Sequence, residues 1–345
     1  MPPQPQTFSG EFKGYAAGMV QSQIPASDFI NVVAGASSDD FAINFDPTAN
    51  SLSAHLTVRD VQQGDGATSA YHFGFGDSGD SVGIKSAFID DLRFAAIEGG
   101  TPGSTTVDIS ANNSYANATS TAYLVSGDQL NVTKFFPDTF AETSPGSGVR
   151  PFCINCDFIK WGAWGARVEF GPKGNPSNFV DNIHLGWWVA GDLASTNDLD
   201  TLAALNATAR YNGYVIGDVA SNFNNAGWKT YVAAGDLAMA WNFAQRSGDL
   251  QISKFDTANF NNGLTFSGPM SAPGVANGNR FTGPLYGQLP SNLGSLSGSA
   301  VGSFVNNGDM KAAGVIGNWN VVNSAYRAGG IFAGAGSPIT GLHGN

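Results

Sequence analysis

Apolar and polar residues alternate along the last third of the chain, in short runs that end at Asn, Gly, Asp, Ser or Pro. Alternation with a period of two predicts half-buried strands, and the residues between the runs are those that form turns. Eight strands can close into a barrel whose interior is either filled by side chains or holds one small ligand. The eight strands predicted here span residues 209–219, 230–243, 250–255, 264–270, 280–286, 296–304, 312–319 and 326–333.

Glycines recur inside these predicted strands, at positions 213, 217, 298, 302, 314, 317, 329 and 330. Glycine weakens a strand interior, so its repeated use calls for a steric reason. A narrow, sharply coiled barrel supplies one, because its strands must bend and approach each other closely. The alternative is a partly disordered glycine-rich segment, but aromatic and β-branched residues alternate with the glycines, which favours the barrel.

The first part of the chain is also predicted to consist of strands, giving an all-β protein. We expect an N-terminal antiparallel β domain over residues 1–200 and an eight-stranded antiparallel β-barrel over residues 201–345. A short helix over residues 192–204, capped by Ser195 or Thr196, would connect the two. Residues 86–96 fit either a short helix or a strand.

The two parts open in a similar way. Residues 14–18 (GYAAG) match residues 213–217 (GYVIG) in glycine spacing, and an alternating strand follows each. This pattern predicts a weak internal duplication of one β-meander. The alternative is coincidence among glycine-rich strands.

The closing strands carry a family resemblance. The segments GSAVGSFVNN, KAAGVIGNWN and YRAGGIFAG, within residues 298–334, resemble the end of the barrel in transferrin-binding protein B and related bacterial surface lipoproteins. Residues 153–165 and 241–256 also resemble parts of exported alphaproteobacterial proteins that carry a FecR domain. The first resemblance implies a surface protein, whose family partners are iron carriers or haem proteins of the host. The family's aromatic-glycine-proline step is absent here, and no ligand-binding residue of the family can be matched.

Charged residues make up 12% of the chain and the net charge is −11. Nucleic-acid binding needs a basic stripe, and binding to anionic membranes also needs positive charge, so both partners are disfavoured. No run of apolar residues is long enough for a transmembrane helix. The outer barrel faces are predicted to be polar rather than lipid-facing, since they carry Arg210, Asn212, Asp218, Lys229 and Lys311.

The residues MPPQPQTF at the start lack the basic and apolar regions of a secretory signal. If the protein is exported, we expect that a signal has been removed or that the chain is part of a longer one. The predicted location is extracellular or on the outer cell surface, with no signal visible in the chain itself.

Cys153 and Cys156 are the only cysteines, spaced Cys-x-x-Cys. A thioredoxin-like pair would open a helix in a βαβ unit, and that context is missing. Zinc would need two further ligands. We therefore expect a small structural disulfide of an exported protein, with a redox role and a split metal site as alternatives.

Several polar motifs could bind a metal or cofactor, but each has a simpler interpretation. His55, His72, His184 and His343 are scattered, and lone strand histidines are usually surface residues rather than metal or haem ligands. The acidic turn at residues 77–80 and the pairs at 39–40 and 90–91 offer calcium-type oxygen ligands without EF-hand spacing, so solvated turns are expected. Glycines 74, 76 and 79 match a dinucleotide motif in letters alone. No cofactor is predicted, with calcium as the weak alternative.

Four tryptophans crowd two predicted strands just before the barrel: Trp161, Trp164, Trp187 and Trp188. One interpretation is a core cluster under the domain junction, because aromatics dominate core burial. The other is an exposed patch that binds a protein or sugar partner. Since neighbouring strand residues point to opposite faces, Trp187 and Trp188 cannot lie on the same side.

No catalytic motif is present, so we predict that the protein is not an enzyme. The predicted function is non-enzymatic binding of a protein or small ligand through loops at a barrel mouth, at residues 221–228, 257–263 and 272–279. The alternative is a structural subunit of an extracellular filament or matrix that self-associates through an exposed strand edge.

Overall fold

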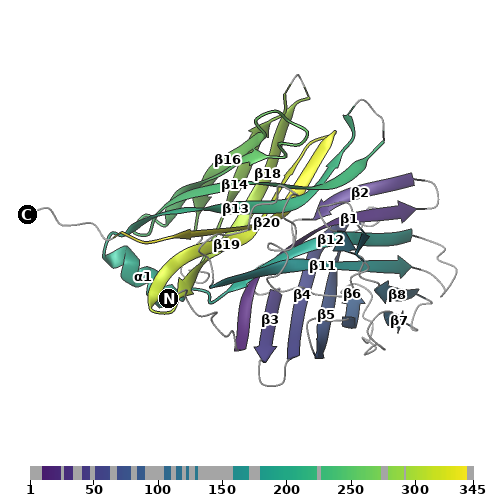
Figure 1. Ribbon diagram of the computed structural model, residues 1–345, viewed down its shortest axis with the longest axis horizontal. Helices are drawn as coiled ribbons and strands as arrows, with labels where there is room; N and C mark the ends of the chain where they lie inside the picture. The colour runs from purple at the N-terminus through teal and green to yellow at the C-terminus, as the bar shows by residue number, and fades with distance from the viewer. Residues whose placement is uncertain are drawn as a thin grey trace, which may run out of the picture.

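The structure, a computed structural model of the 345-residue chain, shows a closed barrel with a broad sheet against one wall (Figure 1). It describes residues 10–24, 27–33, 41–46, 51–62, 68–78, 84–89, 105–109, 114–118, 122–123, 129–130, 158–170, 179–223, 227–272, 279–290 and 293–339. Within these it describes the side chains of residues 10–19, 41–44, 54–55, 158–159, 161, 186–223, 227–272, 279–290 and 293–339. The predicted all-β fold is confirmed.

The barrel consists of eight antiparallel strands in chain order, and the last strand pairs with the first. The strands are β13 (Thr208–Ser221), β14 (Lys229–Asn242), β15 (Ser247–Phe255), β16 (Leu264–Ser271), β17 (Arg280–Gln288), β18 (Ser295–Asn307), β19 (Met310–Val322) and β20 (Tyr326–Gly336). All eight predicted strands are present, with ends within three residues of those predicted. The closed ladder leaves the barrel without an edge strand.

Side chains fill the barrel. Alternate residues of each strand point inward, as with Tyr211, Val215 and Val219 on β13, and together they form one buried cluster. Large aromatic rings meet across the interior, since the Trp319 ring lies 4.9 Å from that of Phe255 by ring centroids. Of the two possibilities for an eight-stranded barrel, the structure therefore has the filled interior.

The glycines in the strands allow this close coiling. On β13, a Cβ atom added at Gly213 would lie 1.9 Å from the carbonyl oxygen of Ala333 on β20. No side chain fits at that separation. The predicted steric role for glycine is confirmed at this position.

Helix α1 (Thr196–Ala204) closes one end of the barrel. Ser195 is its N-cap, and the Ser195 hydroxyl accepts a hydrogen bond from the Asp198 backbone N–H at 3.1 Å. Leu199 and Leu202 are buried in the barrel core. The predicted helix and its Ser195 cap are confirmed, and the domain boundary predicted near residue 200 falls inside a helix that packs on the barrel.

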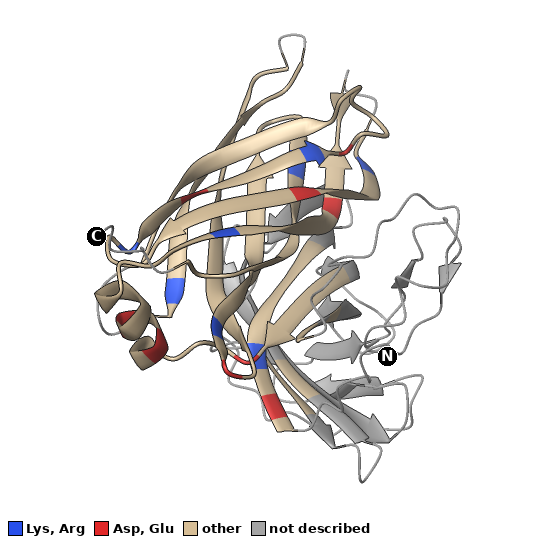
Figure 2. Cartoon of the chain, turned by 60° about the vertical axis from the view of Figure 1, so that its left-hand side comes forward, with Lys and Arg blue, Asp and Glu red and all other residues tan. Residues whose placement is uncertain are grey.

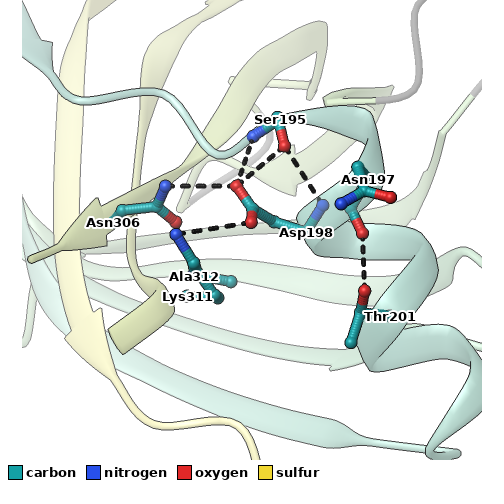
Figure 3. Close-up of polar contacts among 7 residues, drawn as sticks. All are labelled: Ser195, Asn197, Asp198, Thr201, Asn306, Lys311 and Ala312. Carbon is teal, nitrogen blue, oxygen red and sulfur yellow. Dashed lines mark hydrogen bonds and ion pairs between the residues drawn. The ribbon is translucent and has the colours of Figure 1, made fainter. Parts of the chain in front are cut away.

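The start of α1 is tied to the hairpin between β18 and β19 (Figure 3). The Asp198 carboxylate accepts hydrogen bonds from the Ser195 backbone N–H at 2.9 Å and from the Asn306 side-chain amide at 3.3 Å, and Lys311 Nζ lies 3.4 Å away. Burial raises the pKa of Asp198, but these hydrogen bonds and the Lys311 charge outweigh it, so the pKa lies below its usual value. The connection between the two parts of the chain is therefore anchored to the barrel.

The N-terminal part forms one antiparallel sheet, with strand order β6-β5-β4-β3-β1-β12-β11-β8-β7 and with β2 also paired to β1. Its strands are β1 (Gly10–Ile24), β2 (Ser27–Val33), β3 (Phe41–Asp46), β4 (Ser51–Gln62), β5 (Thr68–Ser78), β6 (Ile84–Ile89), β7 (Thr105–Ile109), β8 (Ser114–Ala118), β11 (Ile159–Phe170) and β12 (Phe179–Gly191), while β9 (Ala122–Tyr123) pairs with β10 (Gln129–Leu130). Where residues 86–96 are described, they belong to strand β6 rather than to a helix. In the N-terminal part β3, β4 and β5 form an antiparallel meander beside β1, and the duplication itself stays a prediction.

The sheet and the barrel share a buried interface. Tyr15, Trp187 and other residues of β1, β11 and β12 pack on Ile216, Ile316 and Ile331 of the barrel wall. Neutral hydrogen bonds cross it, for example between the Tyr15 hydroxyl and the Ser303 hydroxyl at 2.6 Å. Apolar burial and these hydrogen bonds together hold the two parts against each other.

None of the described helices has the length and apolar character needed to cross a membrane.

Candidate functional site

The two ends of the barrel carry different connections. The backbone N–H of Asn222, after β13, donates to the carbonyl of Ala325, before β20, at 2.8 Å, so these two loops share one end. The Ala272 backbone N–H, after β16, donates to the carbonyl of Arg246, after β14, at 3.0 Å at the other end. The prediction that residues 272–279 share a mouth with residues 221–228 and 257–263 is therefore wrong, because consecutive connections of an up-and-down barrel alternate between its ends.

The first of these ends, where β13 runs into β14, is closed by a polar and aromatic cluster. The Asp256 carboxylate accepts hydrogen bonds from the hydroxyls of Tyr231 at 2.7 Å and Tyr326 at 3.1 Å. Burial raises the pKa of Asp256, against the lowering effect of its hydrogen-bond donors. The rings of Phe223 and Phe260 pack beside it, 6.0 Å apart by centroids. Helix α1 covers the other end, so described side chains lie over both ends of the filled interior.

The outer wall of β13 to β17 is hollowed instead. A groove of about 730 Å³ runs across these strands, and we call it the outer-wall groove. Its outward-facing side chains are Arg210, Asn212, Ala238, Ala240, Asp249, Gln251, Ser267, Pro269 and Tyr286. It lies outside the wall that packs on the sheet, whose fully buried barrel residues come from β13, β18, β19 and β20.

The strand register explains the shape of this groove. Arg210, Ala240 and Asp249 are paired side by side on β13, β14 and β15, and so are Asn212, Ala238 and Gln251. Adjacent strands lie about 4.8 Å apart, so the side chains that flank each alanine start roughly 10 Å from one another. The two alanines thus form the floor of a slot with longer polar side chains on both sides.

The far side of the groove contains an exposed aromatic ring. Tyr286 on β17 pairs with Ser267 on β16, and 59% of its surface is exposed. Pro269 follows on the same face of β16 and is also exposed. The groove therefore combines an apolar platform with groups that form hydrogen bonds.

The sheet is interrupted beside this platform. Strands β16 and β17 pair at Ser267–Tyr286 and again at Ser271–Thr282, with no pair between them. Continuing the register places Pro269 opposite a second proline, Pro284, and neither has an N–H to donate. The ladder thus has a proline gap where the groove is lined by β16.

Charge is low along the groove. Arg210 and Asp249 stand on opposite sides of Ala240, one positive and one negative, and the other outward-facing side chains that line the groove are uncharged. Figure 2 shows charged residues only sparsely along the barrel strands. The site has no net charge with which to attract a strongly ionic ligand.

The tryptophans predicted to bind a partner do not form an exposed patch in the described region. Trp187 and Trp188 are fully buried and Trp161 is 7% exposed. Trp187 packs on the barrel, whereas Trp188 lies on the opposite face of the sheet and stacks on Phe41 with ring centroids 5.6 Å apart. The core interpretation applies to these three residues, while the side chain of Trp164 lies outside those described.

The other predicted residues do not come together as a site. Cys153, Cys156 and His343 lie outside the described residues, and so do the side chains of His72 and His184 and of the acidic turn at residues 77–80. His55 is exposed. Among the side chains that the structure describes, no group of three His, Cys, Asp or Glu residues is placed to hold a metal ion.

Asp218 is an outward-facing residue of the barrel, as predicted, yet it is buried under the sheet. Its Oδ1 accepts a hydrogen bond from Trp187 Nε1 at 3.3 Å, and Oδ2 has no hydrogen-bond partner among the described groups. Burial raises the pKa of Asp218 well above its usual range. The sequence alone did not show that a second part of the chain covers this wall.

Fold and groove together define a filled eight-stranded barrel with an accompanying sheet and a groove on its outer wall. No protein-family model and no curated protein matches the chain. The chain is similar to a solved structure of the vaccine antigen transferrin-binding protein B from Haemophilus parasuis, a tryptophan-to-alanine mutant. The two chains are 12% identical, and the match covers 98% of this chain and 78% of that chain with a TM-score of 0.35. A similarity of this size identifies no family. The predicted barrel is present, and the resemblance to FecR-domain proteins gains no support.

Proposed function

We propose that the protein is a non-enzymatic binding protein of the cell exterior, and that its ligand occupies the outer-wall groove. The carrying observation is that described side chains fill the barrel interior, while the open wall has a hollow lined by polar groups and an exposed tyrosine. Rigid strands hold these side chains in fixed positions, which favours binding because little ordering is needed. The acidic, lysine-poor composition is that of many exported bacterial β proteins, which supports a location outside the cell.

The alternative function, a filament subunit, would have to use the sheet. The closed barrel has no edge strand, whereas the described order of the sheet ends at β6 and β7. Strand addition requires such an edge. Sedimentation at increasing protein concentration separates the two functions, because a filament subunit forms polymers and a groove-binding protein stays small.

The binding test uses a variant that fills the groove. In Ala238→Gln/Ala240→Gln, two long uncharged side chains replace the floor of the slot. The matched control is Ala234→Gln, since Ala234 is exposed on the same strand and does not line the groove. Both variants leave the inward-facing residues of β14 unchanged.

Wild-type protein is used to capture partners from the medium and the cell-surface extract of the source organism. Each identified partner is then titrated against the wild type and both variants. We expect at least tenfold weaker binding to the filled-groove variant and unchanged binding to Ala234→Gln. Partners that bind all three proteins equally would show that the groove is not the site.

A further inference from the structure

We propose that the outer-wall groove binds a neutral oligosaccharide. This inference rests on the proposed function and adds the chemical class of the ligand. It follows from three features of the groove, namely its stacking platform, its hydrogen-bonding side chains and its charge.

The platform suits the C–H faces of sugar rings. Tyr286 is the one aromatic residue among the exposed large hydrophobic side chains of the described residues, and its ring is an apolar surface with a polar hydroxyl at one end. Ser267 on β16 is the cross-strand partner of Tyr286. Pro269 lies two residues after Ser267, on the same face of β16. A sugar ring can therefore stack on an aromatic ring and a proline ring that are held by neighbouring strands.

The walls of the slot suit hydroxyl groups. Asn212 and Gln251 face each other across Ala238, and Ser267 lies next to Gln251 on the following strand. Amides and hydroxyls both donate and accept hydrogen bonds, as sugar hydroxyls do. The roughly 10 Å between the walls, set by two strand spacings, leaves room for one row of sugar units above the alanine.

Charge favours a neutral sugar over an ionic polymer. Arg210 and Asp249 oppose each other across Ala240, so an anionic ligand that is attracted by one is repelled by the other. An extended peptide is disfavoured for a separate reason. Strand β14, which forms the floor, is already paired with β13 and β15, so a peptide cannot add to it as a strand.

The test measures binding of four neutral probes, cellohexaose, laminarihexaose, maltohexaose and chitohexaose, by titration calorimetry and saturation-transfer NMR. We expect saturable binding of at least one. Tyr286→Ala should weaken it at least tenfold, whereas Tyr286→Phe should stay within about threefold because it keeps the ring. The filled-groove variant should lose binding, and Ala234→Gln should match the wild type.

The inference is overturned if none of the four probes binds, or if the sugar binds the filled-groove variant as well as the wild type. It also fails if a captured protein or peptide, rather than any sugar, requires the open groove. In that last case the proposed function stands and the ligand class is wrong. If neither sugars nor captured partners respond to the filled groove, both proposals fall.

Discussion

The strongest prediction about stability concerns the buried carboxyl group of Asp218. It lies between the barrel and the sheet, 6% exposed, with one oxygen held by Trp187 and the other without a hydrogen-bond partner among the described groups. The substitution Asp218→Asn keeps the shape and the oxygen that accepts the Trp187 hydrogen bond, and removes the titratable proton. We expect this change to abolish one specific dependence of stability on pH.

The sign follows from the raised pKa of Asp218, which burial causes. Between the usual pKa and the raised one, the folded protein holds a proton that the unfolded chain has released. The free energy of unfolding therefore falls as pH rises through this window, by at most about 1.4 kcal/mol per pH unit for a single proton. Over two pH units, the wild type should lose up to about 3 kcal/mol relative to Asp218→Asn.

Urea unfolding followed by tryptophan fluorescence at pH 4.5, 5.5, 6.5 and 7.5 measures this difference. Subtracting the wild type from the variant cancels the other titrating groups. Asp309→Asn, at an exposed turn position, is the control and should parallel the wild type. The reasoning is refuted if the free energies of unfolding of Asp218→Asn and the wild type change in parallel with pH. It is also refuted if the wild type becomes more stable relative to the variant as pH rises.

Three further substitutions test the packing. Gly268→Ala should lower the free energy of unfolding, measured with urea, by at least about 2 kcal/mol, because the added Cβ would lie 1.8 Å from the carbonyl oxygen of Pro284. Ser195→Ala should cost about 1 kcal/mol in the same assay by removing the N-cap of α1, and Ser195→Thr should restore most of it. Tyr326→Phe should cost about 1–2 kcal/mol by removing a hydrogen bond to the buried Asp256, and equal stability would show that this bond contributes nothing.

Much of the barrel could be predicted from the sequence, because its determinants are local. Each strand shows its own alternation, and each turn shows its own Gly, Asn, Asp or Pro. The cap of α1 is also local, since Ser195 and Asp198 are three residues apart. Strand β2 is harder to predict, because it has little alternation of its own and is defined by its pairing with β1.

The site could not be predicted in the same way, since it depends on pairing between strands. Ala238 and Ala240 are ordinary strand residues until the register places Asn212 and Gln251 beside them. The buried state of Trp188 depends on Phe41, far away in the chain. The end of the barrel at which a loop begins depends on the direction of the strand before it, and β16 runs opposite to β13 and β15.

The outward-facing residues of the barrel also explain why the groove lies on one wall. On the wall covered by the sheet these positions include Ile216, Ile316 and Ile331, which gain stability from burial. On the open wall they include Gln251 and Ser267, which form hydrogen bonds with water or a ligand at little cost. One face of the barrel is thus used to hold the two parts of the chain together, and the polar groove is on the face that this contact leaves accessible.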